Sequence, residues 1–121
     1  MPGCFRLAAK VNMSFYRFES DNVGIYEAVN RDCPVDDPKR INKPDGSWLS
    51  RVGPQFPGCI SFWNEAGLKK YISSGLFYWH SIAVRAPITI RKNETLTSVT
   101  YEDEYQAIAD KETLNTARTT T

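Results

Sequence analysis

Alternation of polar and aromatic side chains near the start of the chain predicts a first strand over residues 14–19. Arg17 and Glu19 stand on one side of this pattern, and Phe18 stands on the other. A period of two with many aromatic residues is typical of a strand with one buried face. Turn-forming residues follow, and the spacing of apolar residues over 23–29 then predicts a short helix.

A change from an apolar run to a helical pattern marks the middle of the chain. Residues 59–63 predict a second strand, and Asn64 follows as a suitable N-cap for a helix. Gly75 fits the left-handed position after the end of this helix. Apolar residues share one face of the helix, at Leu68, Tyr71 and Ile72. The segment therefore predicts a strand followed directly by a helix, which can aim side chains into a cleft.

The segment 30–58 between these elements holds five of the seven prolines in the chain. Proline fixes φ and lacks an amide donor, so this segment is not the interior of a sheet. We predict a long Pro/Gly-rich loop that Trp48 pins to the core. Loops of this length in compact domains are often functional, which makes this one a candidate lid or partner surface.

The remaining pattern predicts further extended segments and a single compact domain. Residues 79–90 and 105–109 favour strands, and the last residues are small and polar. We therefore predict an α+β fold with a mostly antiparallel sheet of four to five strands and one main helix. The domain spans residues 13–112, between an N-terminal extension at 1–12 and a flexible tail at 113–121. The predicted core contains Phe18, Ile25, Ile60, Phe62, Leu68, Ile72, Ile82, Val84 and Ile108.

Composition and charge exclude several classes of function. The 121 residues carry fifteen basic and fourteen acidic side chains, which are interspersed and give no evidence for a polyanion-binding face, although a nucleic-acid partner stays open. The three cysteines are far apart and the one histidine is His80, so the ligand set of a zinc site is missing. An odd number of cysteines without a secretion signal indicates free thiols in the cytoplasm. No stretch of about 20 apolar residues occurs, so we expect no membrane partner.

Two glutamates one residue apart, Glu102 and Glu104, are the first candidates for catalysis. Side chains at this spacing in a turn can reach the same side of a cleft. One carboxylate can stabilise a positively charged, sugar-like transition state while the other orients or deprotonates an acceptor. The alternative is a solvated acidic turn.

Three further residues are candidates for ligand binding. Arg17 in the first predicted strand either clamps an anion or extends to the sheet edge. Ser61 points away from its neighbours in the second predicted strand, where a serine can also be a merely tolerated small residue. Trp63 belongs to a group of aromatic residues that either stack on a base or fill the core. His80 reads as a half-buried histidine with a satisfied ring rather than as part of a catalytic triad.

The segments around Arg17, Phe62-Trp63 and residues 101–106 resemble those of small uncharacterised proteins from phages and mobile elements. The order of polar residues also resembles mono-ADP-ribosyltransferases of the arginine-serine-glutamate type, in outline over residues 14–110. In that family a first-strand arginine contacts the dinucleotide, a serine strand supports the pocket, and a final E-x-E carries the catalytic glutamate.

This resemblance implies NAD as co-substrate, with no metal. It implies that Arg17 and Ser61 contact the cofactor. It also implies that Glu104 is the catalytic glutamate and that Glu102 acts on the acceptor side. Trp63, from the group of aromatic residues that can stack on a base, joins Arg17 and Ser61 as a predicted cofactor contact. Where the family has Ser-Thr-Ser, this chain has Ile-Ser-Phe over residues 60–62.

Two hypotheses for function follow. The first is an NAD-dependent mono-ADP-ribosyltransferase-like protein of a phage or mobile element, which passes ADP-ribose to an unknown host protein or nucleic-acid acceptor. The alternative is a small non-catalytic interaction protein that inhibits a host enzyme by occlusion. For the alternative, the Pro/Gly-rich loop with Trp48 supplies the contact surface.

Overall fold

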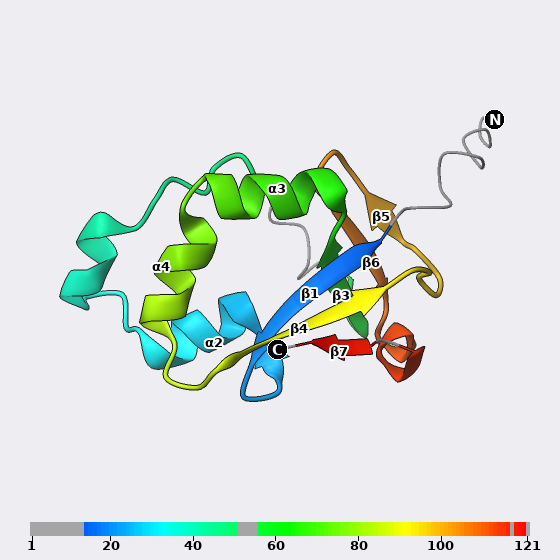
Figure 1. Ribbon diagram of the computed structural model, residues 1–121, viewed down its shortest axis with the longest axis horizontal. Helices are drawn as coiled ribbons and strands as arrows, with labels where there is room; N and C mark the ends of the chain where they lie inside the picture. The colour runs from blue at the N-terminus through cyan, green and yellow to red at the C-terminus, as the bar shows by residue number, and fades with distance from the viewer. Residues whose placement is uncertain (1–13, 51–55, 117, 121) are drawn as a thin grey trace.

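The computed structural model describes residues 14–50, 56–116 and 118–120. The predicted extension at 1–12 lies outside these ranges. Within them, one antiparallel sheet is combined with α-helices, which confirms the α+β class (Figure 1). The described residues form seven strands and three α-helices, more than the four to five strands and one main helix predicted from the sequence.

In chain order the elements, with η for a 3₁₀-helix, are β1 Phe15–Ser20, β2 Val23–Gly24, α2 Ile25–Asp32, η2 Pro38–Asn42, β3 Cys59–Trp63, α3 Glu65–Ser73, α4 Leu76–Ala83, β4 Ile88–Asn93, β5 Tyr101–Glu102, β6 Gln106–Asp110, η4 Lys111–Thr116 and β7 Arg118–Thr120.

The sheet consists of two halves that meet at one point. Its strand order is β5-β6-β3-β1-β4-β7, with the short β2 paired to β1. Strand β1 pairs with β4 along its whole length, and β3 does the same with β6. In the part of the chain that the structure describes, β1 and β3 pair only where Tyr16 lies opposite Trp63. The two halves therefore diverge on one side of this pair, and we call this place the fork.

The hydrophobic core lies between the sheet and the three α-helices. Strand β1 contributes Phe18 and β3 contributes Trp63, and helix α3 inserts the fully buried Tyr71 between them and α4. The rings of Phe18 and Tyr71 meet edge to face at 5.1 Å, and those of Trp63 and Tyr71 stack at 4.9 Å. The remaining members of this core are Ile25, Ala28, Val29, Cys33, Leu76, Trp79, Ala83 and Val84.

Helix α4 replaces an extended segment that the sequence predicts over 79–90. Its buried residues Leu76, Trp79, His80 and Ala83 recur at helical spacing, so tertiary packing selects a helix in spite of the aromatic content. Gly75 ends α3 and caps α4 with φ of 86°, as its predicted left-handed position requires. The helix turns Ile82 toward solvent, where 46% of it is exposed.

Some of the other predicted core residues are buried, and others are partly or largely exposed. Phe62 and Ile108 are buried as predicted, and Ile60 and Leu68 are half-buried. Ile72 is 53% exposed, because α3 packs with Gly67 and Tyr71 toward the sheet and so turns Ile72 outward.

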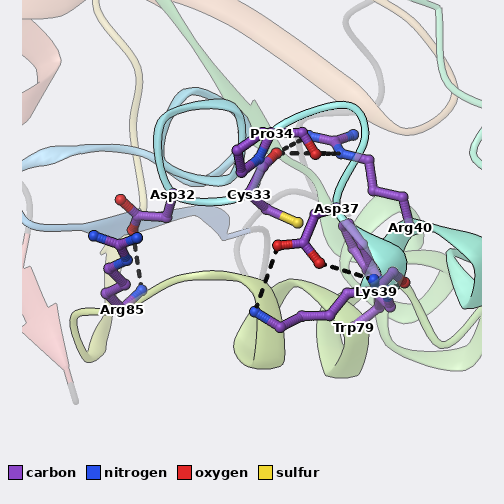
Figure 2. A network of polar contacts seen from close by, with 8 residues as sticks. All are labelled: Asp32, Cys33, Pro34, Asp37, Lys39, Arg40, Trp79 and Arg85. Carbon is purple, nitrogen blue, oxygen red and sulfur yellow. Dashed lines mark hydrogen bonds and ion pairs between the residues drawn. The ribbon is translucent and has the colours of Figure 1, made fainter.

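The segment between α2 and β3, which we call the arm, is described over residues 33–50 and 56–58, and Figure 2 shows how residues 33–40 are tied to the helices. Arg40 donates from Nη2 to Cys33 O at 2.6 Å and from Nε to Pro34 O at 3.0 Å, so its guanidinium satisfies carbonyls at the end of α2. Trp79 Nε1 donates to Lys39 O at 2.9 Å. Further along, Trp48 packs against the rings of Trp63 and Tyr105, as the sequence predicts. These contacts make the described arm an ordered cover.

Residues 113–116 end η4, and residues 118–120 form β7. The sequence predicts a flexible tail from residue 113, whereas Thr113 is fully buried and its hydroxyl accepts from Thr97 N at 2.9 Å. Residues 118–120 pair with β4 and add an outer strand to the sheet (Figure 1).

The buried pair Tyr71–His80 links α3 to α4. Tyr71 Oη and His80 Nδ1 lie 2.7 Å apart, and His80 is 1% exposed. Burial, together with the positive charges of Lys43 and Arg40, lowers the pKa of His80 to about 4. The satisfied ring agrees with the sequence prediction, although it lies on a helix and not at a strand start.

This pair predicts a loss of stability in mild acid. A histidine in the unfolded chain titrates near pH 6.5, so below that pH the unfolded chain binds a proton that the folded chain excludes. We expect the free energy of unfolding to fall by about 2 kcal/mol between pH 7 and pH 5. Denaturant unfolding at a series of pH values measures this slope. The variant His80→Gln should lose the slope between pH 7 and 5, and a slope equal to that of the wild type would contradict the assignment.

Candidate functional site

A pocket of about 280 Å³ lies at the fork of the sheet. It is bounded by β1 on one side, β3 on the other, and by the start of α2 and the end of the described arm. Its volume is near the lower limit of small-molecule pockets, which begin at roughly 300 Å³. The residues that line it are Tyr16, Arg17, Phe18, Gly24, Ile25, Tyr26, Glu27, Leu49, Ser50, Ser61, Phe62, Trp63 and Gln106.

Arg17 spans the fork. Its Nε donates to Glu19 Oε2 at 2.8 Å, and its Nη1 donates across the fork to Ser61 O at 3.3 Å. The side chain is 15% exposed. The sequence leaves open whether Arg17 clamps an anion or extends to the sheet edge; in the structure it lies in the pocket wall and is ion-paired with Glu19.

Glu19 holds two arginines at once. Its Oε1 accepts from Arg91 Nε at 2.8 Å while its Oε2 accepts from Arg17, and the residue is 4% exposed. Burial by itself opposes ionisation of this carboxyl, but the hydrogen bonds from Arg91 and Arg17 outweigh it and hold the pKa of Glu19 below its ordinary value. The cluster therefore stays ionised at neutral pH and carries a net positive charge.

Ser61 and Trp63 both line the pocket, but by different means. Ser61 is exposed in β3, and it is the carbonyl of this residue that contacts Arg17. Trp63 is 7% exposed and lies between Tyr71 and Trp48, so it belongs to the core and also presents part of its ring to the pocket. The two roles considered for Trp63, core and platform, are combined in one side chain.

Glu102 and Glu104 flank the turn between β5 and β6 and do not line the pocket. Both are exposed, and the turn is organised by Asp103 between them. Asp103 Oδ1 accepts from Tyr105 N at 2.9 Å and from Gln106 N at 3.0 Å. Both residues are therefore exposed at this turn, as the alternative of a solvated acidic turn predicts.

Asn64 connects this turn to the pocket. Its Nδ2 donates to Glu104 O at 3.0 Å, and its backbone N–H donates to Tyr105 O at 3.1 Å. Trp63 precedes it and pairs with Gln106, and both residues line the pocket. The backbone of Glu104 is thus held beside the end of β3, two residues before Gln106 of the pocket wall.

Sequence reasoning missed several residues that build the site. Glu19 was read as part of the strand pattern, although its spacing of two from Arg17 puts both on one face and is a detectable signal. Arg91 joins them through the β1–β4 register, which places it opposite Arg17. Gln106 reaches Ser50 O with its Nε2 at 2.7 Å, a contact between segments far apart in the chain.

The comparisons with known proteins add no assignment. No protein-family model matches the chain, and no curated protein or solved structure matches it either.

Two searches of the described residues bear on metals and membranes. No group of three or more His, Cys, Asp or Glu residues that could hold a metal ion occurs among residues 14–50, 56–116 and 118–120. The helices in the described part of the chain are too short or too polar to cross a membrane. Cys33 and Cys59 are free thiols, and Cys4 lies outside the described residues.

Proposed function

We propose that this chain is an NAD-dependent mono-ADP-ribosyltransferase-like protein whose dinucleotide binds at the fork. One observation carries the proposal: the three segments that resemble the family's motifs lie on neighbouring strands. Strand β1 holds Arg17 and the adjacent β3 holds Ser61, and both residues line the pocket. Glu102 ends β5, and Glu104 lies in the turn that leads into β6 on the other side of β3. The strand order thus brings together segments that are far apart in sequence, which supports a common site, and the two carboxylates lie outside the pocket lining.

The chemistry of the pocket suits a dinucleotide. Arg17 offers a fixed guanidinium to a phosphate group, and Trp63 and Tyr26 offer aromatic surface to a ring. A pocket of about 280 Å³ takes one part of such a molecule. The remainder would extend past Gln106 toward Glu104 at the β5–β6 turn.

The proposed reaction uses the carboxylates of that turn. The bond between nicotinamide and ribose breaks, and nicotinamide leaves with the bonding electron pair. Glu104 stabilises the positive charge that develops on the ribose. Glu102 orients the acceptor nucleophile, which forms the new bond to the ribose carbon and gives up its proton to the Glu102 carboxylate.

Incubation with labelled NAD and a host lysate tests the proposal. We expect transfer of label by the wild type and loss of NAD binding in Arg17→Lys, which keeps the charge but not the planar fork of donors. Lys92→Met is the matched control, because Lys92 is an exposed cation on β4 that does not line the pocket. Absence of both NAD binding and label transfer in the wild type would reject the proposal.

A second function is favoured by two exposed apolar side chains in the arm. Val35 is 82% exposed and Ile41 is 83% exposed, whereas Trp48 packs inward. The alternative proposal is therefore a non-catalytic interaction protein that contacts a host enzyme through Val35 and Ile41. The double variant Val35→Asp, Ile41→Asp should lose a partner that both the wild type and Glu104→Gln retain. A partner retained by all three would reject this alternative.

A further inference from the structure

We propose that Glu19 is a positioning residue that presents the Arg17 guanidinium to the phosphates of the bound dinucleotide. The inference rests on the proposed function for the identity of the ligand. The position of Glu19, buried beneath the pocket wall and without a place in its lining, makes it a residue that acts through Arg17.

The register of the sheet makes such a residue necessary. Arg17 and Arg91 are directly opposite each other in the β1–β4 ladder. Like charges at directly opposite positions repel and would drive the two guanidinium groups apart. Glu19 lies two residues along β1 on the same face and accepts one hydrogen bond of 2.8 Å from the Nε of each arginine. The carboxylate thus holds both side chains in fixed orientations.

The opposite side of the Arg17 guanidinium is closed by Gly24. A Cβ atom at this position would lie 2.9 Å from Arg17 Nη2 and 3.4 Å from its Cζ. Gly24 has φ of −58°, which any residue can adopt, so the glycine is required by space and not by backbone conformation. Glu19, Ser61 O and Gly24 together restrict the orientation of the guanidinium in the pocket wall.

The change in charge and the change in Arg17 position predict opposite effects of Glu19→Gln on anion binding. Removal of a negative charge next to the pocket would by itself strengthen the binding of an anion. Loss of the carboxylate also releases the two opposed arginines, which would withdraw Arg17 from its binding orientation. If Glu19 positions Arg17, the second effect dominates and the variant binds anions more weakly in spite of its higher positive charge.

Calorimetric titration with NAD and, separately, with inorganic pyrophosphate tests this prediction. We expect Glu19→Gln to weaken the binding of both probes roughly 10-fold, and its effect on pyrophosphate binding should vanish in an Arg17→Lys background. That non-additivity is a readout that a general loss of stability would not produce. Gly24→Ala displaces the guanidinium from its other side and keeps the Glu19 carboxylate and its contact with Arg91, so it should also weaken binding if Glu19→Gln does not fold.

Each outcome separates the inference from the proposed function. Equal or tighter binding by folded Glu19→Gln or Gly24→Ala would overturn the positioning role and leave the transferase proposal standing. Pyrophosphate binding that depends on Glu19, without NAD binding or label transfer, would uphold the positioning role and reject the transferase. A wild type that binds neither probe would overturn both.

Discussion

Replacement of Glu104 by glutamine is expected to lower the rate of ADP-ribose transfer by about 100- to 1000-fold, the usual effect of removing one group that stabilises developing charge. NAD binding should change little, because Glu104 is exposed and does not line the pocket. The variant keeps the size of the side chain and the carbonyl that Asn64 contacts. Single-turnover transfer of labelled ADP-ribose, measured beside calorimetric NAD binding, separates the two effects.

The control for this prediction is Glu94→Gln, which neutralises an exposed glutamate outside the pocket and the β5–β6 turn. It should leave both transfer and binding unchanged. If Glu104→Gln transfers ADP-ribose at the rate of the wild type, Glu104 is not the catalytic carboxylate. The turn would then be the solvated acidic turn that the sequence offers as the alternative.

Gly67→Ala is expected to reduce the free energy of unfolding by about 3 kcal/mol, as overpacking of a closed site does. Gly67 lies in the first turn of α3, where its backbone N–H donates to the Asn64 cap at 2.8 Å. A Cβ atom here would overlap the carbonyl oxygen of Tyr105 and lie 2.9 Å from Trp63 Cε3. Neither neighbour can move without opening the contact between α3 and the β5–β6 turn.

Helix propensity alone predicts the reverse, since alanine stabilises a helix interior by about 1 kcal/mol relative to glycine. Denaturant unfolding of wild type and variant therefore decides between local preference and tertiary packing. Gly46→Ala is the matched control, because its Cβ would meet Leu76 Cδ2 at an ordinary 3.6 Å. A more stable Gly67→Ala would show that this packing has been misassigned.

The elements that could be predicted are those whose signals are local. Asn64 caps α3 through its own side chain, and Gly75 takes the left-handed conformation that few other residues adopt. Strand β1 follows from its alternation, which also puts Arg17 and Glu19 on one face. Such features depend on a few neighbouring residues, so they can be read before the fold is known.

Helix α4 shows where local reading fails. The run from Leu76 to Ala83 is rich in aromatic residues, and alternation over 79–90 predicts an extended segment that overlaps it. Its buried residues also recur at helical spacing, and the two patterns cannot be separated in so short a segment. Packing of Trp79 and His80 against the arm and α3 decides for the helix.

For the candidate site, the sequence by itself determined which residues are candidates: the guanidinium of Arg17, the serine strand and the paired carboxylates of Glu102 and Glu104. Only the tertiary structure decided which of them share the pocket: Arg17 and Ser61 line it, and Glu102 and Glu104 do not. The strand order joins their three segments, the β1–β4 register sets Arg91 against Arg17, and the fork opens the pocket. The physical reason is that side-chain type is a local property, whereas strand pairing depends on contacts between residues far apart in the chain.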